Sequence, residues 1–321
     1  MDLTYTNAQR DDLGVLKAYA LDMSFGTSEN DFELVCGPSE PVLEDDAIIY
    51  CDGTEYGGII DGKKSVSNSE TITYCGRTWH GLLNSKVIEP DNGDDYFIVS
   101  GEANAILSTL VVRLGLTDLF SAASEQSGIN ISRYQFNRYC KGYDGICAML
   151  ASVNAKLKIS WDEDCSVKLC AVPIVDYTED PADGDTAVLS VEQYANRVNH
   201  LICLGRGNLS AREVIHLYVD QFGKIGTTQY YTGIKEYSEI YDNANAESSE
   251  VLKADGIKKL TELCDINKSD ISVKETDTSY DIGDIVGATD YVSGLSVATA
   301  VTQKIIRINN GIVDVEHKTG S

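Results

Sequence analysis

The stretch 47-AIIYCDGTEYGGII-60 carries the strongest signal for a β-rich fold in the sequence. Two runs with strand composition flank Asp52-Gly53, a dipeptide that supplies the positive φ angles of a tight type I′ turn. The pair Gly57-Gly58 in the second run indicates a bulge or a close backbone approach, because glycine otherwise weakens the interior of a strand. We therefore predict a β-hairpin over residues 47–60.

The residues on either side of this hairpin show regular periods of their own. Phe32 and Leu34 fall on one side of an extended chain, which predicts a strand with one buried face. After the polar turn cluster at 91–95 the period changes to about 3.6, which predicts two helices, one capped by Ser100 and one by Asp144. The chain thus contains both β-rich and mixed segments.

The sequence predicts a β-rich α+β chain with three domains. We expect a first tube-like β-barrel domain over 1–95, an α+β insert domain over 96–180 and a second tube-like β-barrel domain over 181–321. The second barrel carries one helix over 246–264, and the barrel domains flank the α+β domain or interleave with it. The last boundary rests on the acidic segment 179–185, which has the composition of an exposed connector.

The charge of the chain argues against several classes of function. Its 321 residues carry 26 Lys and Arg against 50 Asp and Glu, and the resulting net charge of −24 opposes general binding to a nucleic-acid duplex or an anionic membrane. An apolar content of 43% argues against disorder.

The first residues lack the basic and apolar parts of a signal peptide, so we expect synthesis in the bacterial cytoplasm, with the nine scattered cysteines reduced.

Histidines and cysteines are the first candidates for chemistry. His80 has Trp79 on one side and Gly81 on the other and is a candidate pocket residue, although packing at a strand end is the simpler interpretation. The closest cysteine pairs, Cys140–Cys147 and Cys165–Cys170, lack the tight spacing and the partner pair of a zinc site. We interpret these thiols as buried small hydrophobic groups.

Other ligand-binding motifs are incomplete as well. The acidic loops at 91–95 and 180–185 lack the residue spacing that wraps a calcium ion. The loop 205-GRGNLS-210 lacks the third glycine of the dinucleotide fingerprint and the lysine of a P-loop. We therefore expect no catalytic, cofactor-binding or metal-binding residue and no cofactor.

Several short stretches acquire a meaning together that none has alone. They occur in order along nearly the whole chain and consist of strand and turn residues. Together they resemble the hub proteins of contractile phage tails, a family that includes prophage-derived, bacteriocin-like particles of Gram-positive bacteria and is related to the T-even baseplate hub. The stretches are 30–34 with 54–60, 76–83, 134–136 with 144–150, 196-NRVNHLICLG-205 with 212-REVIHLY-218, and 280–286 with 301–308 and 318–320.

This resemblance implies a structural protein without enzymatic activity. It implies a homotrimer that forms a pseudo-hexameric adapter between the hexameric tail tube protein and the trimeric spike protein, next to other baseplate proteins. Such a protein assembles into the baseplate of a virion or a phage-tail-like particle and has no membrane partner. Passage of DNA through its lumen, without specific binding, stays open, because bacteriocin-like particles carry no genome. Three chains at −24 each carry −72, and we expect much of this charge to line the lumen and repel DNA.

The resemblance also singles out residues that we expect to determine the fold. They are glycines at strand and turn positions, together with aromatic, amide and charged residues beside them. These family-motif residues are Asn30, Phe32, Gly57, Gly58, Gly76, Trp79, Asn199, Gly205, Arg212, Gly283 and Asp284.

Two other functions remain open at this point. The first is a tail-associated cell-wall hydrolase, which would use His80 or His216 with a nearby acid or cysteine. The second is an unrelated sugar-binding β-protein. A monomer that clears peptidoglycan would favour the first, and binding to a glycan array would favour the second.

Overall fold

The computed structural model divides the chain into two compact units. The first holds Met1–Leu189 and Asp270–Ser321, and the second holds Ser190–Ser269. The expected ranges 1–95, 96–180 and 181–321 stay a prediction. The structure describes residues 1–27, 29–66, 68–162, 164–178, 187–193, 197–221, 223–264, 267–275, 280–290, 295–309 and 311–319, so the predicted connector at 179–185 lies outside the described residues.

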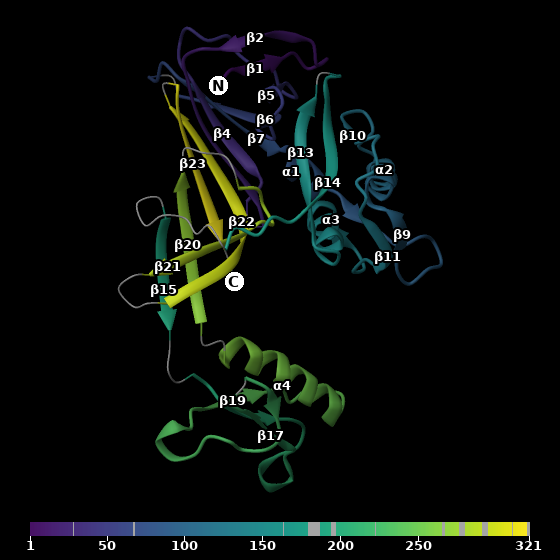
Figure 1. The fold of residues 1–321 in the computed structure, drawn as a ribbon, viewed down its shortest axis with the longest axis vertical. Coiled ribbons are helices and arrows are strands. Elements are labelled where there is room, and N and C mark those ends of the chain that lie inside the picture. The colour runs from purple at the N-terminus through teal and green to yellow at the C-terminus, as the bar shows by residue number, and fades with distance from the viewer. Residues whose placement is uncertain are drawn as a thin grey trace. The chain divides into compact units, whose positions relative to one another are not determined.

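One large sheet dominates the first unit and takes its strands from both ends of the chain. Strand β22 (Leu295–Asn309) pairs antiparallel with β3 (Tyr19–Gly26), with Ile306 opposite Met23. On its other side β22 pairs with β23 (Ile312–Thr319). Figure 1 shows these yellow C-terminal strands beside the purple N-terminal ones. Residues that are almost 300 positions apart are therefore neighbours in one sheet.

The strand order of this sheet is β15-β20-β23-β22-β3-β4-β7-β6-β5-β1-β2, and β21 pairs with β22 off this path. The remaining strands are β1 (Leu3–Thr6), β2 (Asp12–Leu16), β4 (Asp31–Cys36), β5 (Ile48–Tyr50), β6 (Gly57–Ser65), β7 (Ile72–Thr78), β15 (Ala187–Gln193), β20 (Asn267–Glu275) and β21 (Ile285–Asp290).

The fold class is confirmed as β-rich α+β, but the expected closed barrels are not seen. Among the described strands, the path of the sheet has two free ends, β15 and β2, so it does not close within one chain. Strand β2 pairs with β1 along one edge. Its side chains Leu13 and Val15 are exposed, at 55% and 43%. A tube would therefore need further strands beside this edge.

The predicted strands of the first hundred residues are confirmed. Strand β4 buries Phe32 and Leu34 and exposes Glu33 between them, as its period of two predicts. Strands β5 and β6 form the predicted hairpin, with Tyr50 opposite Gly57. The predicted tight turn at Asp52-Gly53 is present, because the Thr54 amide donates to the Cys51 carbonyl at 3.2 Å, but it is not of type I′, since Gly53 has a positive φ of 67° and Asp52 does not. Six residues connect the two strands, and the Cys51 amide donates to the Tyr56 carbonyl at 2.9 Å.

A second core of the first unit is built from helices and short sheets. Glu102, not Ser100, caps the predicted first helix, because its carboxylate accepts from the Ala105 amide at 3.0 Å. Lys141 occupies the N-cap of the predicted second helix, and Asp144, the predicted cap, lies in the first turn of that helix. The elements are α1 (Trp79–Asn84), α2 (Ala103–Arg113), α3 (Gly142–Ala151), the sheet of β10 (Phe120–Ala122), β14 (Ser166–Pro173) and β13 (Ala155–Asp162), and the pairs β9 (Ile98–Glu102) with β11 (Asn130–Gln135) and β8 (Val87–Ile88) with β12 (Cys140–Lys141).

The second unit is a four-stranded sheet with one helix, α4 (Ser249–Cys264), packed against it. Gly256 in this helix lowers its propensity, but a Cβ there would lie 2.4 Å from the sulfur of Cys203, so the glycine lets the helix approach the sheet. Figure 1 shows α4 beside β17 and β19. The strand order is β18 (Ile225–Gly226), β17 (Val214–Val219), β16 (His200–Leu204) and β19 (Ser238–Asp242), with short 3-10 helices at Leu209–Ala211 and Gly233–Lys235.

None of the described helices has both the length and the apolar character that a crossing of a membrane requires.

Candidate functional site

Six of the eleven family-motif residues meet in the first unit. The ring of Phe32 lies over two glycines on neighbouring strands: a Cβ would be 2.9 Å from this ring at Gly58 and 2.8 Å at Gly76. At Gly57 a Cβ would lie 2.4 Å from the ring of Trp79. The glycines thus form a slot for two aromatic rings, which we call the glycine–aromatic cluster (Phe32, Gly57, Gly58, Gly76 and Trp79).

Trp79 connects this cluster to the second core of the unit. Its fully buried ring stacks on Trp161 of β13, with ring centres 5.5 Å apart and planes 18° apart. Trp161 in turn stacks on Tyr50 at 4.2 Å. This column of rings joins the large sheet to the smaller one, and buried aromatic pairs of this kind stabilise a fold by about 1 kcal/mol beyond the area they bury.

Asn30 closes the connection between β3 and β4 next to this cluster. Its side-chain oxygen accepts from the Gly26 amide at 3.0 Å, and its side-chain nitrogen donates to the Gly26 carbonyl at 2.9 Å. The Asn30 carbonyl accepts from the Thr78 amide at 3.1 Å. Asn30 therefore replaces a missing pair of ladder hydrogen bonds and fixes where α1 begins.

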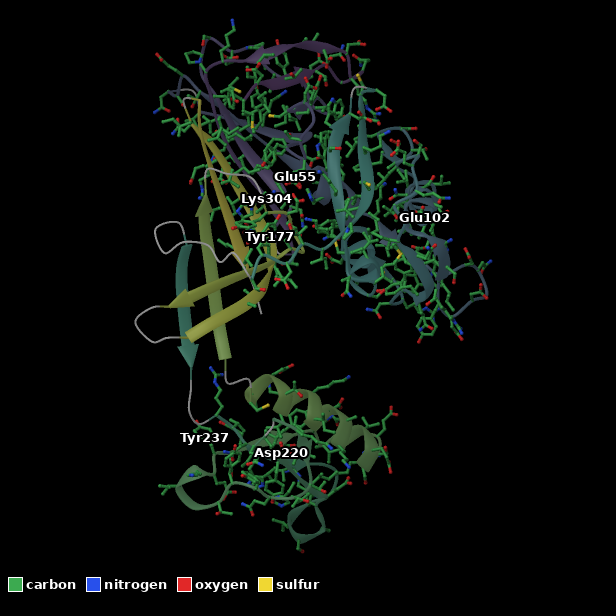
Figure 2. All side chains as sticks on the ribbon, viewed as in Figure 1. Glu55, Glu102, Tyr177, Asp220, Tyr237 and Lys304 are labelled. Atoms are coloured by element: carbon green, nitrogen blue, oxygen red, sulfur yellow. The ribbon has the colours of Figure 1, made fainter. Side chains whose placement is uncertain are left out.

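Asp284, a further motif residue, belongs to a buried charge network that we define as Glu55, Lys156, Asp281, Asp284 and Lys304, and the motif residue Gly283 precedes it in the chain. The Lys156 ammonium donates to Asp284 at 2.6 Å and to Asp281 at 2.9 Å. The Lys304 ammonium donates to Glu55 at 2.6 Å and lies 3.7 Å from Asp281. Figure 2 shows Glu55 and Lys304, from distant parts of the sequence, side by side in the first unit.

Asp284 has more partners than any other member of the network. It is fully buried, and besides Lys156 its carboxylate accepts from the amides of Val175 and Asp281, both at 2.9 Å. The preceding Gly283 has a φ of 99°, in the left-handed region that favours glycine. The turn thus aims the Asp284 carboxylate at the buried ammonium of Lys156.

The two lysines set the charge state of this network. Burial raises the pKa of Asp281, but the hydrogen bond from Lys156 and the charge of Lys304 outweigh it, so the pKa lies below its ordinary value. Burial lowers the pKa of Lys304, but Glu55 outweighs it, so that pKa is raised. Asp281 and Lys304 therefore stay ionised at neutral pH, and each charge of the network has an opposite partner.

Two buried histidines border the network. His80 has an Nε2 that lies 3.8 Å from Glu55, and burial and the nearby Lys304 lower its pKa to about 3. His317 donates from Nε2 to the Tyr280 carbonyl, 3.0 Å away, and the same two causes lower its pKa to about 4. Both rings are therefore neutral at physiological pH. A cavity of about 260 Å³ lies beside this region, with His80, Glu55 and Lys304 in its wall.

The other three motif residues lie in the second unit. Asn199 bonds to the loop before β19: its side chain donates to the Lys235 carbonyl at 2.8 Å and accepts from the Tyr237 amide at 3.0 Å. Arg212 donates to the carbonyl of Gly205 at 3.1 Å and pairs with Asp242. Both therefore hold β19 against β16 rather than facing a pocket.

We expect Asn199→Ala to destabilise the second unit by about 1–3 kcal/mol, because the Tyr237 amide and the Lys235 carbonyl would lose their partners in a largely buried position. Hydrogen exchange of amides in β16 and β19 measures this loss. Asn208→Ala, in the exposed loop between β16 and β17, is the control and should change exchange little. Equal effects of the two variants would contradict the bridging role of Asn199.

His216, the other histidine considered for hydrolysis, lies in a chain of polar groups on β16 and β17. His200 Nε2 lies 2.8 Å from His216 Nδ1, and His200 Nδ1 lies 2.6 Å from Glu236. His216 itself is exposed. Among the described residues, no hydroxyl or thiol is hydrogen-bonded to His216, and none of the described His, Cys, Asp and Glu side chains form a group of three that could hold a metal ion.

Sequence reasoning singled out Asp284 and missed the other four members of the buried charge network, Glu55, Lys156, Asp281 and Lys304. A signal was present for Lys304, which shares the two-residue period of the buried Ile306 and Ile308. A lysine on the buried face of a strand requires a buried carboxylate as partner, but its identity depends on tertiary contacts.

Comparisons with known proteins find likeness in structure only. No family model matches the sequence, and no curated protein matches it. The 43 kDa tail protein of prophage MuSo2 from Shewanella oneidensis superposes with a TM-score of 0.52 at 12% identity, over 99% of this chain and 98% of that one. The prophage tail protein gp18 from Listeria monocytogenes EGD-e gives a TM-score of 0.51 at 12% identity, over 100% and 94%. The chain has the fold of prophage tail proteins.

A third solved structure, the tail protein from Neisseria meningitidis MC58, covers 100% of this chain and 96% of its own at 13% identity, with a TM-score of 0.49. The likeness to the Shewanella and Listeria tail proteins includes both units of this chain, because it spans nearly its full length. A structural likeness that came from one common sheet motif alone would not extend over both units of this chain.

Proposed function

We propose that this protein is a structural baseplate hub of a contractile tail or phage-tail-like particle. As a homotrimeric, pseudo-hexameric adapter it would join the hexameric tail tube to the trimeric spike, contacting the tube protein, the spike protein and other baseplate proteins. The observation that carries the proposal is the likeness in fold to two prophage tail proteins over nearly the whole of both chains. The resemblance of the sequence to hub proteins supports the more specific role.

The open large sheet supports assembly from several chains. Strand β2 is the last strand at one end of the sheet: one of its edges pairs with β1, and its other edge has no partner among the described strands. It exposes Leu13 and Val15. Exposed edge strands pair readily with other chains, so proteins normally protect them. In a ring, the neighbouring chain would cover this edge, and the tube-like walls that we propose for 1–95 and 181–321 would close between molecules rather than within one.

The charge of the chain fits a lumen through which DNA passes without binding. A net charge of −24 per chain gives a trimer a strongly negative potential, which repels the phosphate backbone if the acids line the bore. The protein would be made in the bacterial cytoplasm and assembled into the baseplate of a virion or phage-tail-like particle. In this role the eleven family-motif residues maintain the fold rather than carry chemistry.

The surroundings of the two candidate histidines give a structural role more support than hydrolysis. His80 is 2% exposed and stacks on Phe25, with ring centres 4.4 Å apart. His216 ends a chain of hydrogen bonds that holds together strands of the second unit. We therefore propose no enzymatic step for this chain.

Mass photometry of the purified protein, combined with a peptidoglycan-clearing assay, tests this proposal. We expect a species of three times the 35.0 kDa chain mass and no clearing. Leu13→Arg on the edge strand should shift the protein toward the monomer, whereas Val112→Arg, on the exposed face of α2, is the control and should not. A stable monomer that clears peptidoglycan would contradict the proposal and favour the hydrolase.

A further inference from the structure

We propose that the buried charge network, together with His80 and His317, is an acid-sensitive latch that holds the C-terminal segment 280–319 on the rest of the first unit. The latch is a property of a single chain, so it stands whether or not three chains assemble.

The latch lies where three separate parts of the chain meet. The C-terminal segment contributes Asp281, Asp284, Lys304 and His317, which lie on β22, β23 and the turn before β21. Glu55 and His80 come from the first hundred residues, and Lys156 comes from β13. The three hydrogen-bonded ion pairs, Lys304 with Glu55 and Lys156 with Asp284 and with Asp281, therefore each join the C-terminal segment to another part of the unit.

His80 lies in a site built for a neutral ring. Phe25 of β3 stacks on it with planes 8° apart, and Tyr143 of α3 meets it edge-on with ring centres 5.2 Å apart. Glu55 is the carboxylate that approaches it, at 3.8 Å, but the other oxygen of Glu55 already binds Lys304. Its Nδ1 is buried and has no hydrogen-bond partner among the described residues. A proton on His80 would thus add a second positive charge beside one shared carboxylate.

His317 is the second buried histidine beside Lys304. It is directly opposite Lys304 in the pairing of β22 with β23, and it is fully buried. Tyr280 accepts at its carbonyl, 3.0 Å from His317 Nε2, and meets the ring edge-on. Asp281 is the nearby acid, and it already pairs with Lys156 and faces Lys304. Protonation of His317 therefore also adds a charge next to a fixed cation.

The direction of the effect follows from the two protonation states. When segment 280–319 opens far enough to expose both rings to water, each histidine has its ordinary pKa of 6.5, whereas in the closed form burial and Lys304 hold the pKa of His80 at about 3 and that of His317 at about 4. Below pH 6.5 the open form binds protons that the closed form cannot, so stability falls as the pH falls. Between pH 7 and pH 5 each histidine should raise the opening constant about 20-fold, and the two together several hundredfold.

Hydrogen exchange measured at pH 7 and pH 5, and corrected for the intrinsic pH dependence of exchange, tests the latch. The wild-type amides of 301–308 should show the several-hundredfold increase in opening. His80→Phe and His317→Phe should each reduce the increase to about 20-fold, and the double variant should remove the part due to histidine. His216→Gln, in the second unit, is the matched control and should behave like the wild type. An unchanged increase in the double variant would overturn the proposal.

A second measurement uses the unaltered protein and so does not depend on whether the variants fold. Calorimetric unfolding at pH 6 in buffers of different ionisation enthalpy counts the protons taken up. The latch predicts an uptake of about 1.5 protons from the two histidines. An uptake near zero, or imidazole NMR signals of His80 and His317 that titrate near pH 6.5 in the folded protein, would refute it.

Discussion

Gly76→Val is expected to lower the urea concentration at which the first unit unfolds far below that of the wild type. A Cβ at this position would lie 1.9 Å from the Ile59 carbonyl oxygen and 2.8 Å from the ring of Phe32. Overpacking against movable side chains costs about 1–3 kcal/mol. Here the obstacle is the main chain of the neighbouring strand, so the cost should exceed about 3 kcal/mol, a large share of the stability of a typical domain.

Urea unfolding followed by tryptophan fluorescence measures this loss, because both tryptophans, Trp79 and Trp161, lie in the first unit. Gly62→Ala is the matched control: it lies on the adjacent strand β6, and its Cβ would meet only the sulfur of Cys75, at 3.5 Å. We expect this variant to unfold at nearly the wild-type urea concentration. If Gly76→Val were as stable as Gly62→Ala, the glycine–aromatic cluster would not determine the fold.

Asp284→Ala should destabilise the first unit by about 3–5 kcal/mol, because it leaves the buried ammonium of Lys156 with Asp281 alone. It also removes the acceptor for the amides of Val175 and Asp281. Adding Lys156→Met should restore part of the loss, since the unpaired charge disappears while the two amides stay unsatisfied. Urea unfolding of the two single variants and the double variant gives the coupling energy.

Asp45→Asn is the control for this experiment. It breaks the ion pair between Lys63 and Asp45, whose side chains are 43% and 69% exposed, respectively. Such exposed ion pairs contribute about 0–1 kcal/mol to stability. If Asp284→Ala cost no more than Asp45→Asn, or if Lys156→Met restored nothing, the buried charge network would not stabilise the unit in the way that its geometry indicates.

Local patterns of the sequence predicted the strands well, because their side chains alternate between a buried and an exposed face. The strand at Asp31–Cys36 and the hairpin around Asp52 depend on neighbouring residues only. The pairing of β22 with β3 could not be predicted in this way, since many strands in the chain have a suitable alternation. The open sheet, in place of closed barrels, follows from such distant pairings.

The candidate site could likewise be predicted only where neighbouring residues in the sequence determine it. The glycines at 57, 58 and 76 were singled out from the sequence, but the rings that fill the space above them are known only from the structure. Glu55 and Lys156 carry no local signal, because nothing near them in the sequence shows that each lies beside a buried charge 100 or more positions away. The predicted helix cap at Ser100 is wrong for a related reason. Glu102 caps this helix instead, and its longer side chain also accepts a hydrogen bond from the distant Ser127 amide.

Cryo-electron microscopy of the purified protein tests the proposed hub most directly. The account predicts a ring of three chains around an axial hole, with sheets of neighbouring chains joined at the β2 edge and acidic side chains lining the bore. A single chain with an exposed β2 edge, or a ring whose bore is neutral or basic, would contradict it.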